Sequence, residues 1–241
     1  MEGGPELATP PAQTSVRTSI MRQALGADFV KLHPHLQSQY GFTSADGLCF
    51  KGQGIMDEVW RGPFFYIPFL LVGATRRVMF PETGRNVPFT IRNYAYTDTL
   101  GRETLTWTRE FTLKRTRRFD ETMIYSPKRG CIVVYAGTHQ HLAVDLFVRP
   151  GPEGELIFTT GEQRMYERAL AFRYPSMLSG KADVVEWVNT KLDRFEVDVS
   201  IRNRFLGRIF GYRGWFRGGI QACTPEEVPS DVKPVREEIR H

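Results

Sequence analysis

Thr104-Leu-Thr-Trp-Thr-Arg-Glu-Phe-Thr-Leu113 is the stretch of sequence that decides the fold class. Large apolar side chains occupy alternate positions in it, at Leu105, Trp107, Phe111 and Leu113, and polar side chains lie between them. Because successive side chains of a β-strand point to opposite faces, this alternation predicts a strand with one buried face. Arg109 interrupts the apolar series, and we expect it either to be paired in the interior or to lie at the end of the strand.

Alternation of the same kind recurs along the chain, and turn signals separate the runs. Phe119, Met123 and Tyr125 continue the pattern, and Phe195, Val197, Val199 and Ile201 repeat it. Residues 97–101, 126–130, 150–154 and 189–193 are rich in turn-forming residues. An open sheet of about ten short strands tends to curl or split. We therefore predict a mainly β fold, an antiparallel meander curled into a calycin-like barrel or half-barrel.

The N-terminal part of the chain carries a different pattern. Apolar residues recur at helical spacing from Ile20 to Leu36, with Ser19 as a cap and Pro34 ending or restarting the helix, so we predict an N-terminal helical segment. Both chain ends are rich in proline and polar residues and lack apolar periodicity. We expect a single β-rich domain at residues 17–221 between a disordered arm at 1–16 and a disordered charged tail at 222–241.

Composition limits the compartment and the class of protein. Cys49, Cys131 and Cys223 are widely spaced and form no disulfide framework, and the residues after Met1 lack the features of a secretory signal. We therefore expect a cytoplasmic protein. The apolar run at residues 63–74 is shorter than the about 20 residues of a membrane span and contains two prolines, so it predicts buried loop and strand.

Basic residues exceed acidic ones, giving a net charge of +5, and they cluster. The clusters are residues 114–118 and the arginines Arg202, Arg204, Arg208, Arg213 and Arg217. Such clusters can neutralise phosphates. However, residues 114–118 fall in a predicted hairpin turn, where a charged run is usually solvated surface. We do not expect a nucleic-acid partner.

The most informative candidate site lies in residues 138–148. Strand alternation sends His139, His141 and Asp145 to one face, and it sends to the other face Leu142, Val144, Leu146 and Val148. Two imidazoles and a carboxylate on one face could bind a metal ion, act as acid and base on a substrate, or form a solvated polar surface. The spacing allows all three.

Two further alternating polar sets could complete such a site. One consists of Glu162, Arg164 and Tyr166, and the other of Arg92, Tyr94 and Tyr96. Facing a barrel interior, they would supply an arginine for an anionic group, hydroxyls for orientation and a carboxylate as a base. Facing outward, they would be ordinary cross-strand pairs.

Familiar cofactor motifs are absent from the sequence. Residues 51–57 begin like a dinucleotide-binding loop but lack its third glycine, and the chain has neither a Walker loop nor a Gly-x-Ser-x-Gly elbow. No convincing set of metal ligands accompanies the two histidines. We expect neither a cofactor nor a metal ion.

Several segments together resemble a known family. They are residues 21–26, 60–63, 80–84, 122–127, 137–142 and 210–214, with Gly137-Thr-His-Gln-His-Leu142 among them. The chain resembles a bacterial domain of unknown function that occurs alone or fused behind saccharopine-dehydrogenase-like domains. The resemblance covers roughly residues 20–220 and implies no established activity, but the fusion suggests small-molecule metabolism and an oxidoreductase as a partner.

These observations lead to one main hypothesis. The barrel binds a largely apolar small molecule, such as a biosynthetic intermediate, and promotes its isomerisation or cyclisation without a cofactor. His139 and His141 would be acid or base, oriented by Asp145 or Glu162. Arg92 or Arg164 would steady negative charge, and Tyr94, Tyr96 and Tyr166 would position the ligand.

Two other classes of function stay open. A non-catalytic domain that docks on an oxidoreductase would show an exposed apolar patch and no closed cavity. A metal-dependent enzyme would bring His139, His141 and Asp145 together around one ion.

Overall fold

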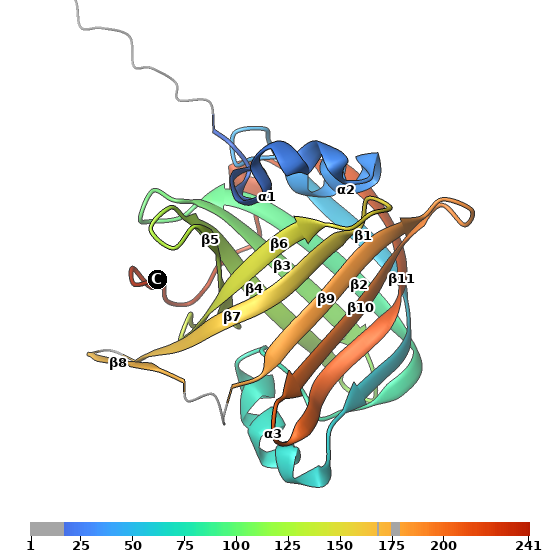
Figure 1. Cartoon of the computed structure of the whole chain (residues 1–241), viewed down its shortest axis with the longest axis vertical. Coiled ribbons are helices and arrows are strands. Elements are labelled where there is room, and N and C mark those ends of the chain that lie inside the picture. Colours follow the sequence, from blue (N-terminus) through green and yellow to red (C-terminus); the bar gives the residue numbers. More distant parts are fainter. Residues whose placement is uncertain (1–16, 168, 175–178) are drawn as a thin grey trace, which may run out of the picture.

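The computed structural model describes residues 17–167, 169–174 and 179–241. The expected disordered arm at residues 1–16 therefore lies outside the described residues. Most of the described chain forms antiparallel strands, and short helices lie at the two ends of the strand assembly (Figure 1).

The strands close into a barrel, which confirms the predicted fold class. Within the described residues ten strands follow one another around it, each antiparallel to its neighbours, and the ring closes through β1–β11 and β6–β7 pairing. β8 extends outside the ring from the end of β7. The strands are β1 (Leu48–Arg61), β2 (Gly84–Thr97), β3 (Glu103–Thr112), β4 (Thr116–Ser126), β5 (Cys131–Ala136), β6 (Leu142–Pro150), β7 (Leu156–Glu167), β8 (Leu170–Arg173), β9 (Lys181–Asn189), β10 (Arg194–Asn203) and β11 (Gly207–Ala222).

Alternating apolar residues fill the inside of the barrel. On β3 the predicted apolar series is buried at Leu105, Trp107 and Phe111, and these residues join one continuous core. Glycines allow the strands that close the ring to approach each other. A Cβ atom on Gly54 of β1 would overlap the backbone carbonyl of Trp215 on β11, so a larger residue would push these strands apart.

The N-terminal segment covers one end of the barrel with two short helices, α1 (Ile20–Leu25) and α2 (Pro34–Gly41), joined by a 3₁₀ turn (Figure 1). Ser19 caps α1 by accepting a hydrogen bond from the Arg22 amide at 3.3 Å. Gly26, with a φ of 54°, ends α1, and Pro34 starts α2 because its fixed φ suits the first helical turn. The predicted helical segment is thus confirmed, with two breaks.

The other end of the barrel carries α3 (Ile67–Thr75), which follows a 3₁₀ turn at Phe64–Tyr66 (Figure 1). The expectation of buried loop and strand for residues 63–74 was wrong. Pro68 lies in the first turn of α3, where a missing amide hydrogen costs nothing, and Leu70 is the buried residue of the helix. No helix in the described part of the chain is long and apolar enough to cross a membrane.

The C-terminal segment, residues 222–241, differs from the expected disordered tail. It runs along the outside of the barrel, where Val228 and Val232 are buried against Tyr94 and Tyr96. The Val235 amide also donates a hydrogen bond to the Thr138 carbonyl at 2.7 Å. The apolar residues that make these contacts are too widely spaced to form a periodic pattern, so no sequence pattern indicates the contacts.

Candidate functional site

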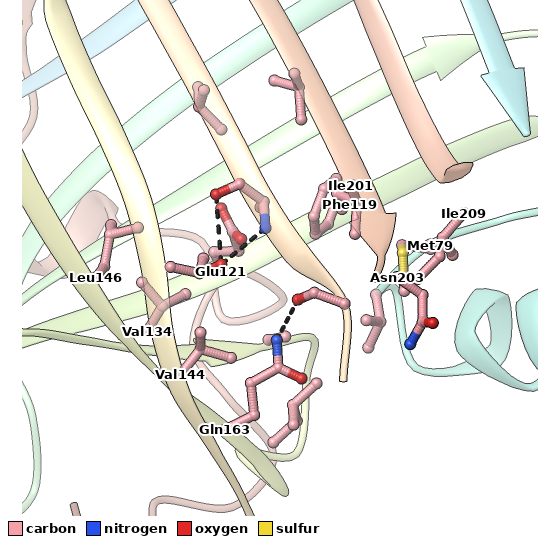
Figure 2. A pocket seen from close by; sticks show the side chains of 18 of the residues that line it. Met79, Phe119, Glu121, Val134, Val144, Leu146, Gln163, Ile201, Asn203 and Ile209 are labelled. Atoms are coloured by element: carbon pink, nitrogen blue, oxygen red, sulfur yellow. Dashed lines mark hydrogen bonds between the residues drawn. The ribbon is translucent and has the colours of Figure 1, made fainter. Parts of the chain in front are cut away.

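A cavity of about 510 Å³ occupies the half of the barrel nearer to α3. This volume lies within the range of small-molecule sites, about 300–1,000 Å³. Figure 2 shows Val134, Val144 and Leu146 turned toward this space from one side, and Ile201 and Ile209 from another. The remaining lining residues are Phe65, Tyr66, Phe69, Val78, Met79, Trp107, Arg109, Phe119, Glu121, Ala136, Leu142, Phe158, Thr160, Gln163, Tyr174, Gly180, Ala182, Val184, Val199, Asn203 and Leu206.

The cavity opens at the α3 end. Phe65, Phe69 and Leu206 line it, yet their exposed fractions are 48%, 52% and 49%. Residues that line a cavity and are also half exposed mark its contact with solvent. A ligand would therefore enter between α3 and the turn that joins β10 to β11.

The β7–β9 pairing ends before it reaches this opening. The ladder stops at Thr159 and Asp183, and two side chains of β7 replace it beyond that point. Thr160 Oγ1 accepts a hydrogen bond from the Ala182 amide at 2.7 Å, and Gln163 Nε2 donates to the Gly180 carbonyl (Figure 2). These side-chain bonds link β7 and β9 beside the cavity, where the backbone ladder no longer joins the two strands.

Arg109 and Glu121 are the charged side chains in a cavity wall that is otherwise apolar or neutral, among the described residues. Arg109 Nη2 donates to Glu121, and Nη1 donates to Tyr212 Oη at 2.8 Å. Burial acts to lower the pKa of Arg109, but the negative charge of Glu121 and the contact with Tyr212 outweigh it and raise that pKa. Arg109 is therefore a fixed cation. It is paired in the interior, which is one of the two placements expected from the sequence.

Aromatic rings hold the guanidinium in place. Its central carbon lies 4.3 Å from the centroid of the Phe119 ring and 5.3 Å from that of Trp107, which is a cation–π arrangement. Phe119 and Glu121 both point inward from β4, because they are two residues apart on that strand. The rings thus fix the position of the ion pair in the wall.

Glu121 presents a hydrogen-bond acceptor to the cavity. Its side chain is 20% exposed, against 5% for Arg109. Arg109 contacts Oε2, and Oε1 accepts no hydrogen bond from the residues that the structure describes. A ligand inside the cavity therefore meets a carboxylate oxygen whose lone pairs are available.

Three donors in the cavity wall also lack a partner in the described part of the chain. They are Trp107 Nε1, Arg109 Nε and the Tyr66 hydroxyl, all buried. Buried polar groups nearly always have a partner, so such atoms mark places for a ligand or for ordered water.

A second buried carboxyl group lies deeper in the barrel, toward α2. Glu186 of β9 accepts a hydrogen bond from Tyr40 Oη at 2.7 Å, and it is 3% exposed. Burial raises the pKa of Glu186 to about 7, although the contacts with Tyr40, Gln39 and Arg109 act in the opposite direction. Near neutral pH both protonation states of this group are therefore populated, but it does not line the main cavity.

The residues predicted from the sequence as site residues do not line the cavity. His139 and His141 stack on each other, with ring centroids 5.4 Å apart, in the connection between β5 and β6. His141 contacts Glu167 and lies 3.1 Å from Arg76. Their expected roles as acid and base stay predictions.

Asp145, Glu162 and Arg164 lie on the outer face and form ion pairs with one another. Arg129 and Arg164 both donate to Asp145 at 2.7 Å, and both also contact Glu162. Burial acts to raise the pKa of Asp145, but hydrogen bonds from the two arginines lower it below its ordinary value. This ion-pair network holds β6 and β7 to the β4–β5 turn, and Arg173 of β8 also joins it through Glu162.

The predicted ligand-binding residues of β2 and β7 also face outward. Tyr94 and Tyr96 are buried under the C-terminal segment, and the Arg240 guanidinium lies 4.7 Å from the Tyr166 ring. Arg92 is half-buried on the same outer face of β2. Within the described residues no group of three His, Cys, Asp or Glu side chains could hold a metal ion.

The sequence contains a signal for the charged residues of the barrel interior. Glu121 stands between Phe119 and Met123 in a predicted apolar series of β4. Arg109 interrupts the apolar series of β3 in the same way. Glu186 likewise follows Ala182 and Val184 on the inward face of β9. All three residues share one recognisable feature, a charged side chain at an inward position of an otherwise apolar series.

Comparison with known proteins agrees with the resemblance seen in the sequence. A family model described as Domain of unknown function (DUF4166) matches residues 32–216. The chain is also 32% identical over 187 residues to a Bacillus subtilis (strain 168) protein described as "Uncharacterized protein YndH". This match covers 77% of the chain and 90% of that protein.

Proposed function

The chain belongs to the DUF4166 family of domains of unknown function, and we propose that it binds a largely apolar small molecule inside its barrel. The observation that carries the proposal is the cavity of about 510 Å³, whose apolar wall contains a single ion pair among the described residues. Apolar walls favour an apolar ligand body, since burial of apolar surface gains about 25 cal/mol per Å².

Glu121 determines which polar group of a ligand the cavity favours. Because Arg109 neutralises its charge, the pair attracts neither cations nor anions strongly at long range. The open carboxylate oxygen accepts a hydrogen bond at short range, so it favours a hydroxyl or amine donor. A carboxylate at the same place would face Glu121 directly and would be repelled.

The same oxygen supports a catalytic form of the proposal. A carboxylate in an apolar cavity can take a proton from an acidic C–H bond of the ligand, as an isomerisation or cyclisation without a cofactor requires. In this form Glu121 is the base, and the buried Tyr66 hydroxyl is a hydrogen-bond donor in the wall of the same cavity.

Binding is tested with N-phenyl-1-naphthylamine, a fluorescent apolar probe with one N–H donor. Ala182 points into the cavity from β9, so Ala182→Phe should fill part of the space and lower the affinity at least tenfold. Thr159→Phe adds the same side chain on the exposed face of β7 and should leave the affinity unchanged. Equal affinities for the two variants, or no binding by the original protein, would contradict the proposal.

Proton transfer is tested with β-tetralone, an apolar ketone with acidic C–H bonds. In D₂O the protein should accelerate exchange of these hydrogens, and Glu121→Gln should remove most of the acceleration, since a positioned base contributes about 10²–10⁴-fold. Ala182→Phe serves as the variant with a blocked cavity. If the hydrogens of β-tetralone exchange as fast with Glu121→Gln as with the original protein, the catalytic form of the proposal is refuted and only ligand binding stands.

A further inference from the structure

An exposed apolar surface surrounds the mouth of the cavity. Its side chains come from the turn before α3, from α3 and from the β10–β11 turn, and we name it the mouth patch. The most exposed members are Phe64 (78%), Val72 (67%), Phe205 (60%), Phe69 (52%), Leu71 (50%) and Leu206 (49%). Large exposed apolar surfaces of this kind mark contacts with another protein or with a membrane.

The two segments that form the mouth patch lie side by side. The Gly62 amide donates to the Ile209 carbonyl at 2.8 Å, which joins the start of one segment to the end of the other. Figure 1 shows α3 beside the β10–β11 turn at the end of the barrel opposite α1 and α2. The apolar side chains of both therefore belong to one face of the molecule.

Arginines accompany this apolar surface without matching acids. Residues 60–76 and 199–209 contain five arginines and no aspartate or glutamate: Arg61, Arg76, Arg202, Arg204 and Arg208. All except the half-buried Arg61 are exposed, and none forms an ion pair with a residue in the described ranges. The mouth patch is thus apolar at its centre and positively charged around it.

We propose that the mouth patch docks on an anionic lipid surface, with the apolar side chains of α3 inserted at the level of the headgroups. Docking by the mouth patch does not depend on a ligand in the cavity, but the role that we assign to docking rests on the proposed function. An apolar ligand could then pass between the bilayer and the cavity without crossing water.

Two observations favour lipid over a protein partner. The exposed face of residues 63–74 consists of phenylalanine, leucine, valine and proline and lacks the polar side chains that form the rim of protein interfaces. The surrounding arginines carry a single sign of charge, which is complementary to an anionic membrane surface. Apolar insertion together with basic residues is the combination that holds peripheral helices to membranes.

Flotation with lipid vesicles tests the docking. The protein should bind vesicles made of equal parts phosphatidylcholine and phosphatidylglycerol more strongly than vesicles of phosphatidylcholine alone, and added salt should weaken the binding. Arg204→Gln with Arg208→Gln should lower the partition coefficient on the order of 20-fold, since each basic residue near the surface contributes about fivefold.

Apolar contacts are tested with a second pair of variants. Phe64→Gln with Val72→Gln removes two exposed side chains that do not line the cavity, and it should lower vesicle binding on the order of tenfold or more. Solution binding of N-phenyl-1-naphthylamine should stay unchanged, which separates docking from the proposed ligand binding.

Matched controls come from the opposite end of the barrel. Val30→Gln with Leu192→Gln changes two exposed apolar residues, and Arg149→Gln with Lys191→Gln removes two charges. These controls should bind vesicles as the original protein does. Absence of binding to anionic vesicles, or equal losses in controls and mouth-patch variants, would overturn the proposal. A dimer that Phe64→Gln with Val72→Gln dissociates, without vesicle binding, would assign the patch to a second copy of the chain instead.

Discussion

The interior ion pair predicts a strong energetic coupling between Arg109 and Glu121. Arg109→Met leaves the Glu121 carboxylate and the Tyr212 hydroxyl without their donor, and Glu121→Leu leaves a guanidinium that is 5% exposed without its anion. Removal of one partner of a buried pair costs about 3–5 kcal/mol. Since Glu121 is 20% exposed to the cavity, water can partly solvate it, and we expect about 3 kcal/mol for Arg109→Met and about 4 kcal/mol for Glu121→Leu.

The double variant should behave differently from the sum of the single ones. Replacement of a whole buried ion pair by apolar residues is often neutral, so the double variant should lose less than about 2 kcal/mol and the coupling should be about 5 kcal/mol. Urea unfolding at pH 7 measures the three free energies. The exposed pair of Asp28 and Lys31, with side chains 51% and 65% exposed, provides a control cycle whose coupling should stay below about 1 kcal/mol. Additive losses for Arg109 and Glu121 would refute the assignment of a buried pair.

Three further predictions concern other parts of the barrel. Burial raises the pKa of Glu186 from 4.5 to about 7, so the unfolded chain releases this proton first and stability should fall as pH rises from about 4.5 to about 7. Glu186→Gln should remove that fall, so above pH 7 its free energy of unfolding in urea should exceed that of the original protein by about 3 kcal/mol. Parallel plots of unfolding free energy against pH for the two proteins would contradict this prediction. Val232→Asp should release the C-terminal segment to limited proteolysis while the barrel stays resistant, and equal resistance of the segment would refute its docking. Gly137→Ala should lower the unfolding free energy by about 1–3 kcal/mol, because Gly137 has a φ of 75° and its Cβ atom would overlap the Arg76 carbonyl; no change in the urea midpoint would contradict this.

Local patterns predicted the architecture well for identifiable reasons. The alternation in residues 104–113 arises from the pleat of a strand against one core, so it indicates both the strand and its buried face. The closure of the ring depends instead on contacts far apart in the chain, such as β1 with β11. The sequence therefore left a barrel and a half-barrel open, and only the three-dimensional pairing distinguishes them.

The local patterns do not determine which strand face carries a site, because alternation separates two faces without saying which one is covered by other parts of the chain. His139, His141 and Asp145 were placed opposite the apolar face of β6, and the outer position of Asp145 agrees with that separation. What the pattern could not show is that outer carboxylates are already paired with arginines. It also could not show that the C-terminal segment covers Tyr94 and Tyr96.

Arg109 illustrates what the sequence can show about an interior site. As an interruption in an apolar series it pointed to an interior pair or a strand end, and the structure shows the pair. Its partner Glu121 lies on the neighbouring strand, and their proximity depends on the β3–β4 register. Register is fixed by the whole barrel, so the pair could be suspected but not identified beforehand.

Ligand binding inside the barrel is tested most directly by NMR of the methyl groups that line the cavity. With N-phenyl-1-naphthylamine added, nuclear Overhauser effects should connect the naphthyl protons to the methyl groups of Val134, Val144 and Leu146, which point into the cavity from β5 and β6. The methyl groups of Val30 and Leu192, at the opposite end, should show none. Contacts restricted to the exposed Val72 and Leu71, or no contacts at all, would contradict the proposal that the cavity is the binding site.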